Sequence, residues 1–198
     1  VQLVALTNDV KVADGLFTIH ADAVLKTARK PDLIIVPAVS GNLENAVKLN
    51  SGFLPWIVQH YKKGAEVASL CLGAFVLAAT GLLDGKKCST HWLFANEFRS
   101  MFPQVNLVDN KVVTEQNGVY TSGGANSYWN LLLHLVEKYT NRELAILAAK
   151  FFVLDIERNS QSPFTIFKGQ KIHEDEEIKK VQEYIELHFA DKISVDEL

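Results

Sequence analysis

The sequence has few cysteines, no long apolar run and no excess of basic residues, and each of these absences excludes a class of protein. Two cysteines among 198 residues are too few for the disulfide framework of a small secreted domain. No apolar stretch approaches the roughly 20 residues that a membrane-spanning helix needs. With 20 basic against 23 acidic residues and a net charge of −3, the chain lacks the basic surface that grips a phosphate backbone.

The chain also lacks a signal-peptide pattern at its start, internal repeats and low-complexity tracts. Cys71 and Cys88 suit a reducing compartment, so the sequence favours a cytoplasmic protein with no membrane segment. Its length allows one sizeable α/β domain with an appendage. Residue 1 is a valine inside the apolar run Val1–Leu6, and the last residues open a new helix. We therefore expect the sequence to be part of a longer protein.

What is present is an alternation of apolar strands with helical segments. Strands are predicted over 1–7, 16–22, 32–37, 66–70, 105–108, 111–116 and 119–122, and helices over 43–50, 53–63, 73–80, 91–102, 126–139, 143–154 and 175–189. The run Asp32–Pro37 is apolar throughout its centre, which is typical of a strand buried on both faces. In 126–139, the residues expected to face the core are Leu131, Leu132, Leu135 and Val136. The alternation predicts an α/β layered fold with a mainly parallel sheet.

Three predicted loops, 38–42, 71–73 and 122–125, follow strands of this sheet. Ligands of open α/β sheets bind outside the carboxyl ends of the strands, so the three loops predict a pocket. The residues that could supply backbone N–H donors to an oxyanion or a ligand are Gly41, Asn42, Ser122 and Gly123. Ordinary loop chemistry explains the same residues equally well.

The stretch with the most chemical content is Val67–Ala78, where an apolar strand runs straight into a helix of small residues. Cys71 stands at the junction, with Ser69 and Gly73 two residues to either side. This is the sequence form of a nucleophile elbow, a strained turn whose flanking residues must be small because strand and helix approach closely. A thiol at this position faces a helix N-terminus, which favours the thiolate. The pattern predicts that Cys71 lies at the base of a pocket.

After residue 155 the sequence becomes polar, which predicts a linker or an ordered surface arm over 156–172. Beyond it, the helical spacing of Ile178, Val181 and Ile185 indicates an amphipathic helix. The segment Ser194–Glu197 is a capping box, which predicts the start of a second helix.

Three motifs, taken in order, resemble the ThiJ/PfpI branch of the class I glutamine amidotransferase-like superfamily. They are the elbow Ala68–Ala74, the segment Lys87–Trp92, and Tyr120–Gly124 ahead of a helix. In this chain the segment Gly81–Gly85 follows the elbow, and this form of the motifs is similar to the sensory domains of AraC-type transcription regulators. The segment Asp175–Leu198 resembles the opening of the AraC helix-turn-helix domain.

This resemblance implies a flavodoxin-like three-layer sandwich over 1–155, with a mainly parallel sheet. The linker or arm 156–172 follows, and 173–198 is the truncated start of a helix-turn-helix domain. The implied function is effector binding and dimerisation in an AraC-type DNA-binding transcription regulator. The implied partners are a small-molecule effector, a second copy of the chain, and DNA bound through helices beyond this segment; no cofactor or metal is implied. The chain begins at what would be the family's second strand, so the acidic residue that contacts the cysteine would precede residue 1.

The resemblance also bears on catalysis. Protease-like members of the family place a histidine directly after the cysteine, and isonitrile-hydratase-like members place a threonine. Leu72 stands there in this chain, and a leucine can neither move a proton nor orient water. His91, which the resemblance places beside Cys71, is the remaining candidate base. A Cys–His pair without a third orienting group is an incomplete site, so absence of catalysis is the favoured interpretation.

Two alternatives stay open at this point. One is a cysteine-dependent hydrolase or hydratase that uses Cys71 and His91. The other is a redox sensor in which Cys71 is oxidised and Cys88 resolves it, provided that the two come within disulfide distance. No cluster with zinc-ligand spacing is present. The predicted ligand-binding residues are Gly41, Asn42, Cys71, Leu72, His91, Ser122 and Gly123.

Overall fold

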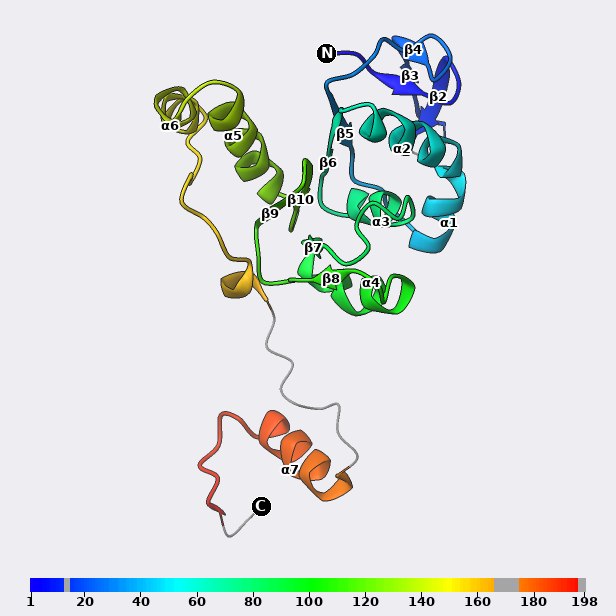
Figure 1. Ribbon diagram of the computed structural model, residues 1–198. Coiled ribbons are helices and arrows are strands. Elements are labelled where there is room, and N and C mark those ends of the chain that lie inside the picture. The colour runs from blue at the N-terminus through cyan, green and yellow to red at the C-terminus, as the bar shows by residue number, and fades with distance from the viewer. Residues whose placement is uncertain (13–14, 166–174, 196–198) are drawn as a thin grey trace. The chain divides into compact units, whose positions relative to one another are not determined.

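The computed structural model describes residues 1–12, 15–165 and 175–195. The chain divides into two compact units, Val1–Phe164 and Thr165–Leu198 (Figure 1). The first unit contains the strands and helices α1 to α6, and the second contains helix α7 (Glu176–Leu187). Within the described parts of the chain, no helix has both the length and the apolar character that crossing a bilayer requires.

The first unit is built on a four-stranded sheet with the strand order β5-β6-β10-β9. Its strands are β5 (Leu33–Val36), β6 (Glu66–Ser69), β10 (Val119–Ser122) and β9 (Val113–Gln116). The first three are parallel, and β9 pairs antiparallel with β10. Between β9 and β10, Asn117 and Gly118 both have positive φ, as a two-residue hairpin requires. The sheet is therefore mainly parallel, as the alternation of strands and helices predicts.

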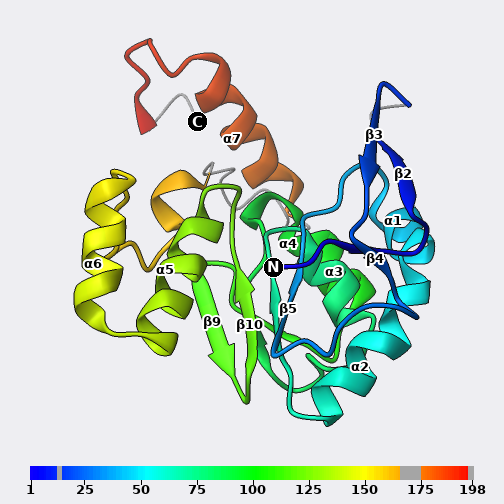
Figure 2. The same ribbon diagram turned by 90° about the horizontal axis from the view of Figure 1, so that it is seen from above.

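Helices cover both faces of this sheet (Figures 1 and 2). One side carries α1 (Leu43–Leu49), α2 (Leu54–Lys62) and α3 (Gly73–Ala78), and the other carries α5 (Ser127–Tyr139) and α6 (Arg142–Phe151). Successive residues of a strand face opposite sides, so Val67 packs in one core with Phe75 while Ala68 packs in the other with Leu131. The first unit is a three-layer sandwich.

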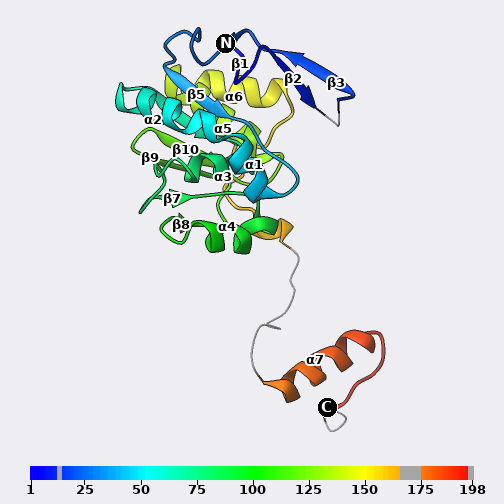
Figure 3. The same ribbon diagram turned by 90° about the vertical axis from the view of Figure 1, so that its right-hand side faces the viewer.

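The remaining elements are short. Two-stranded pairs form between β1 (Val4–Ala5) and β4 (Ala23–Val24), β2 (Asp9–Val12) and β3 (Phe17–His20), and β7 (Lys87–Cys88) and β8 (Asn106–Leu107). Figure 3 shows β1 and the β2–β3 hairpin on the same side of the unit. Helix α4 (Ala95–Met101) follows the 3-10 turn η2 (Trp92–Phe94), and η1 (Ser51–Phe53) and η3 (Ser162–Phe164) are also 3-10 turns.

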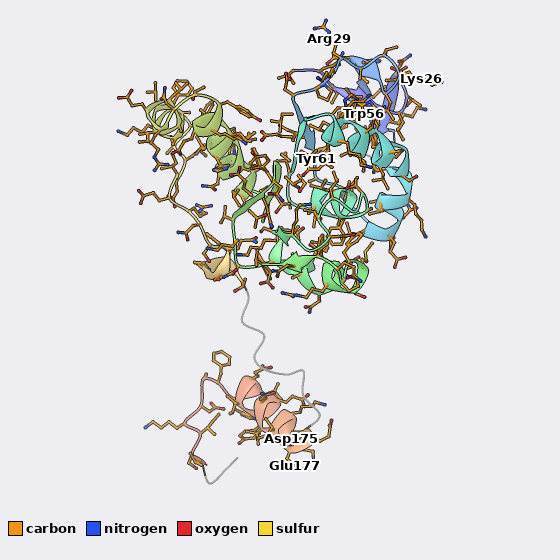
Figure 4. All side chains as sticks on the ribbon, in the orientation of Figure 1. Lys26, Arg29, Trp56, Tyr61, Asp175 and Glu177 are labelled. Carbon is orange, nitrogen blue, oxygen red and sulfur yellow. The ribbon has the colours of Figure 1, made fainter. Side chains whose placement is uncertain are left out.

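Hydrogen bonds from side chains fix the helices that flank the site. Asn42 begins α1, with its Oδ1 accepting from the Asn45 N–H at 2.8 Å. On α2, where Figure 4 labels Trp56 and Tyr61, the Tyr61 hydroxyl donates to the Asn117 carbonyl at 2.8 Å. This contact ties α2 to the turn between β9 and β10.

Two sequence predictions about burial are wrong. Ile35 of β5 is 42% exposed, although a strand buried on both faces was expected. In the described sheet β5 is an edge strand, and Ile35 borders an open apolar groove of about 440 Å³. On α5, Leu133 is buried, whereas Leu132 and Val136 are only partly buried. Both Leu132 and Val136 line the apolar groove, together with the more deeply buried Leu133 and Leu135, so this face of α5 is less completely covered than the spacing predicts.

The second unit contains one described helix, α7, where the spacing of apolar residues predicts it. Asp175 begins α7 by accepting hydrogen bonds from the Glu177 and Ile178 N–H groups, and Figure 4 labels Asp175 and Glu177 at this end. Its apolar residues Ile178, Tyr184 and Ile185 are exposed. The capping box extends into residues 196–198, so the predicted second helix lies outside the described residues.

Candidate functional site

Cys71 occupies the turn between β6 and α3, with a φ of +51°. A non-glycine residue in this left-handed region is held there by its surroundings at a cost in backbone strain. Gly73, two residues later, shows why small residues flank the turn. A Cβ at Gly73 would lie 2.5 Å from the Pro37 carbonyl oxygen and 2.6 Å from the Val36 carbonyl oxygen. The strand, turn and helix therefore have the geometry that the elbow motif predicts.

The backbone of Cys71 joins the ends of neighbouring segments. Its N–H donates to Ser122 Oγ at 3.3 Å, at the end of β10. Its carbonyl accepts from Thr90 Oγ1 at 3.0 Å. Ser122 Oγ in turn donates to the Ser69 carbonyl at 3.5 Å. The structure thus brings together Cys71 and Ser122, two of the predicted site residues, and adds Thr90 and Ser69.

The Cys71 side chain is buried, with 8% of the residue exposed. Burial raises the pKa of the Cys71 thiol, and the hydrogen bond from the Leu72 backbone opposes this only in part. The predicted preference for a thiolate is therefore wrong, because desolvation outweighs the end of a six-residue helix. Cys88 is buried more deeply, and its burial raises the pKa of the thiol to about 12.

We expect Cys71 to react slowly with iodoacetamide at neutral pH, because the thiolate is the reactive form and burial raises the thiol pKa. The alkylation rate should still be rising with pH above 9, as followed by mass spectrometry of the peptide that contains Cys71. A Cys71→Ser variant gives the background from Cys88. Rapid alkylation of Cys71 that persists well below neutral pH would contradict this expectation.

His91 begins the turn η2, and its Nδ1 accepts a hydrogen bond from the Leu93 N–H at 3.2 Å. The predicted helix 91–102 is accordingly wrong at its start, where His91 is a cap followed by a 3-10 turn. Burial lowers the pKa of His91, so the ring is neutral at neutral pH. With the Nδ1 lone pair accepting, the proton resides on Nε2. Among the hydrogen bonds of the described residues, none joins His91 to Cys71, the pair that the enzyme alternative would use.

Of the predicted backbone donors, the Gly123 N–H is used by the fold itself, because it donates to the Val112 carbonyl at 2.8 Å. Asn42 caps α1 through its side-chain Oδ1, which accepts from the Asn45 N–H. Gly41 has a φ of +79° in an exposed loop. Leu72 packs against the core cluster under α3. The Gly123 N–H is therefore not free to serve an oxyanion, and Asn42 has a structural role at the start of α1.

A residue that the sequence analysis did not single out, Gln161, lies among these loops and is only 3% exposed. Its Oε1 accepts from the Gly124 N–H at 2.7 Å. Its Nε2 lies within hydrogen-bonding distance of the carbonyl oxygens of Thr90 (3.0 Å), Asp109 (2.8 Å) and Lys111 (2.9 Å). One side chain thus joins three segments that are far apart in the sequence.

The two glycines after β10 make room for Gln161. A Cβ at Gly123 would lie 2.3 Å from the Gln161 side-chain carbon Cδ, and one at Gly124 would lie 3.3 Å from Oε1. The same position at Gly124 is 3.7 Å from the His91 ring. Gln161 and His91 therefore both lie close to Gly124. No sequence signal marks Gln161, because its surroundings of polar residues are equally typical of a linker.

Two cavities of the first unit, of about 360 and 440 Å³, are lined by other residues than the predicted ligand-binding ones. Among the residues that the structure describes, no three His, Cys, Asp or Glu side chains gather in a way that could hold a metal ion.

These features define the class of protein. It is an α/β protein with a cysteine elbow, in which a cysteine at positive φ follows a parallel strand and helices cover both faces of the sheet. The profile of the DJ-1/PfpI family matches residues 1–138, and the chain belongs to this family. Family membership and the fold of its relatives confirm the predicted flavodoxin-like three-layer sandwich.

The chain is similar to the HTH-type transcriptional regulator GbdR of Pseudomonas aeruginosa, with 27% identity over 192 residues. These residues are 96% of this chain and 51% of the regulator. It is also similar to an isonitrile hydratase of Pseudomonas putida, with 29% identity over 118 residues, 59% of this chain and 49% of the hydratase. The chain therefore spans about half the length of these curated relatives.

Among solved structures, a proposed transcriptional regulator from Vibrio parahaemolyticus superposes with a TM-score of 0.68 and 25% identity. The superposition covers 76% of this chain and 78% of that one.

Proposed function

We propose that this chain is the effector-binding and dimerisation part of an AraC-type DNA-binding transcription regulator, and that it does not catalyse a reaction. The observation that carries this proposal is the alignment with GbdR. It extends over 96% of the chain, beyond the 138 residues of the family domain. The alignment with the isonitrile hydratase, by contrast, covers 59% of this chain.

The geometry around Cys71 supports a binding role over catalysis. The thiol is held protonated by burial, Leu72 cannot transfer a proton, and His91 uses Nδ1 to begin η2. A nucleophilic cysteine needs a base within hydrogen-bonding reach. What remains at the elbow is a buried Ser69 hydroxyl that has no hydrogen-bond partner among the described residues. A buried polar group of this kind is commonly satisfied by a water or a polar ligand.

In the proposed mechanism, a small metabolite binds at the strand ends near Cys71. The residues proposed to contact it are Gly41, Asn42, Cys71, Leu72, His91, Ser122 and Gly123. The metabolite changes the balance between two arrangements of a dimer. It does so only through a difference in its affinity for them, because a ligand with equal affinity for both shifts nothing.

The sequence of the gene beyond Leu198 tests the proposed class directly. We expect it to encode the rest of a domain with two helix-turn-helix units. The full-length product should then bind DNA from its own promoter region in a fluorescence anisotropy assay, with an affinity that falls as salt rises. A stop codon after Leu198, or a continuation without helix-turn-helix units, would contradict the proposal.

The second candidate function is a cysteine-dependent hydratase, which the likeness to an isonitrile hydratase favours. This candidate predicts turnover of an isonitrile by the wild-type chain and its loss in Cys71→Ala. We expect the two proteins to show the same background rate. A turnover that disappears on substitution of Cys71 would establish the enzyme and overturn the claim of no catalysis.

A further inference from the structure

A cavity of about 360 Å³ lies apart from Cys71, between strand β9, helix α5 and the segment 156–159. Its volume is within the range of small-molecule sites in proteins. Three basic side chains line it, Lys87, Lys111 and Arg158. They come from three segments that are distant in the sequence, so only folding places them around one cavity.

These cations are poorly neutralised. Among the residues that the structure describes, Lys87 and Lys111 form no ion pair, and the carboxylate paired with Arg158, that of Asp155, lies 3.9 Å from its Nε. Of the described residues that line the cavity, one carries a carboxylate, Glu115, and it is engaged by His134 at 2.7 Å and by Lys138 at 3.7 Å. In a chain with a net charge of −3, this concave surface is locally positive. Such a surface concentrates small anions.

The rest of the lining is suited to an organic molecule. Val108, Val113 and Ile156 contribute apolar surface beside the basic groups. Asn130 of α5 also lines the cavity and donates through Nδ2 to the Asp155 carbonyl at 2.6 Å, which fixes the start of the 156–159 segment against α5. The cavity wall is therefore built from both the sheet and the segment that follows α6.

We propose that this cavity binds a small organic anion. Its carboxylate or phosphate lies among Lys87, Lys111 and Arg158, and its hydrocarbon part packs against Val113 and Ile156. Charge-assisted hydrogen bonds from three cations supply the specificity for an anion. This site is separate from the effector site proposed at Cys71 and does not depend on it.

Occupation of this cavity stabilises the arm, here defined as residues 156–164. Ile156 and Arg158 belong to the arm, and Gln161, a few residues later, holds it against the ends of β10 and β7. An anion that binds Lys87 and Lys111 on one wall and Arg158 on the other joins the sheet to the arm. We expect slower hydrogen exchange of the arm when the anion is bound.

The test is isothermal titration calorimetry of the 198-residue chain at low ionic strength, with succinate and inorganic phosphate as the two probes. We expect saturable binding of at least one of them, weakened by added salt, and no binding of the uncharged 1,4-butanediol. Preference for succinate identifies a carboxylate site, and preference for phosphate identifies a phosphate site. Absence of saturable binding of both anions would overturn the proposal.

Matched variants distinguish anion binding in the cavity from a general effect of the chain's charge on the affinity. Lys111→Gln and Arg158→Gln should each weaken binding about tenfold, because each removes one charge-assisted contact. Lys150→Gln removes the same charge from α6, outside the cavity lining, and should leave the affinity unchanged. Equal weakening by all three substitutions, or no weakening by the two in the cavity, would show that the anion binds elsewhere. Thermal unfolding of each variant confirms that the comparison is between folded proteins.

Discussion

Replacing Gly73 with Ala is expected to lower the free energy of unfolding by about 3 kcal/mol, the upper part of the usual range for overpacking. The added Cβ would lie 2.5 Å from the Pro37 carbonyl oxygen and 2.6 Å from the Val36 carbonyl oxygen. Both atoms belong to the backbone at the end of β5, so neither can rotate away. Relief requires α3 to move off the sheet, which also displaces Cys71 from its turn.

Urea unfolding of the variant, followed by circular dichroism, measures this loss. Gly52→Ala is the matched control, because a Cβ there meets only the end of the flexible Leu6 side chain, at 3.0 Å. We expect the control to stay within about 1 kcal/mol of the wild type. Equal stability of Gly73→Ala and Gly52→Ala would mean that the close approach of strand and helix does not constrain the elbow.

A Gln161→Leu variant is expected to lose about 3 kcal/mol of stability, because leucine keeps the volume and removes every polar contact. The Gly124 N–H and the carbonyl oxygens of Thr90, Asp109 and Lys111 would lose this partner in a buried setting. Leaving even one buried donor or acceptor unsatisfied costs about 1–3 kcal/mol. The arm 156–164 should then exchange its amide hydrogens faster than the rest of the first unit.

Hydrogen exchange by mass spectrometry, together with urea unfolding, resolves the local from the global effect. Gln59→Leu makes the same chemical change on the exposed surface of α2 and should alter neither measurement. If Gln161→Leu left both the stability and the exchange of the arm unchanged, the amide of Gln161 would have no anchoring role.

Together, these two variants address different parts of the candidate site. Gly73 controls how closely α3 approaches the sheet beneath Cys71, and Gln161 controls how the arm is held at Gly124. Both variants therefore test the scaffold on which the proposed effector site depends. In the proposed regulator, the arm is the segment through which the sensing fold continues into Thr165–Leu198.

The backbone contacts of Cys71 give the elbow a structural role that does not depend on the thiol. The positive φ of Cys71 and its backbone bonds to Ser122 and Thr90 connect β6 to its neighbours. None of these contacts involves the sulfur atom. The turn can therefore be retained for its shape while burial raises the pKa of the thiol and makes it a poor nucleophile.

Local sequence patterns were sufficient to predict most helices and strands of the fold. The apolar runs at β6 and β10, the helical spacing in α5 and α7, and the small residues around Cys71 each depend on neighbours within a few positions. The elbow was predictable for the same reason. Where a strand turns directly into a helix, the residues that flank the turn must be small, and Gly73 meets this requirement. The least accurate boundaries are those of two predicted elements. The strand expected over 1–7 is only β1, two residues long, and the helix expected over 91–102 begins with a 3-10 turn after His91.

The role of individual site residues was less accessible, because it depends on contacts between distant segments. The sequence suggested a thiolate at Cys71 from the adjacent helix, but the surrounding layers desolvate the thiol and reverse the direction of the pKa shift. It suggested His91 as a base, but the Leu93 N–H occupies Nδ1. It assigned Gln161 to a polar linker or arm, although this side chain is among the most buried polar groups described.

By itself, the sequence determined the α/β alternation, the cysteine elbow and the resemblance to the DJ-1/PfpI family, because strand and helix periodicity and the need for small residues are local properties. Only the tertiary structure decided which polar groups are satisfied, which charges gather and which thiol is protonated. Burial, hydrogen bonding and electrostatic potential at Cys71, at Gln161 and in the basic cavity are set by residues up to 72 positions apart, and no local pattern encodes that proximity.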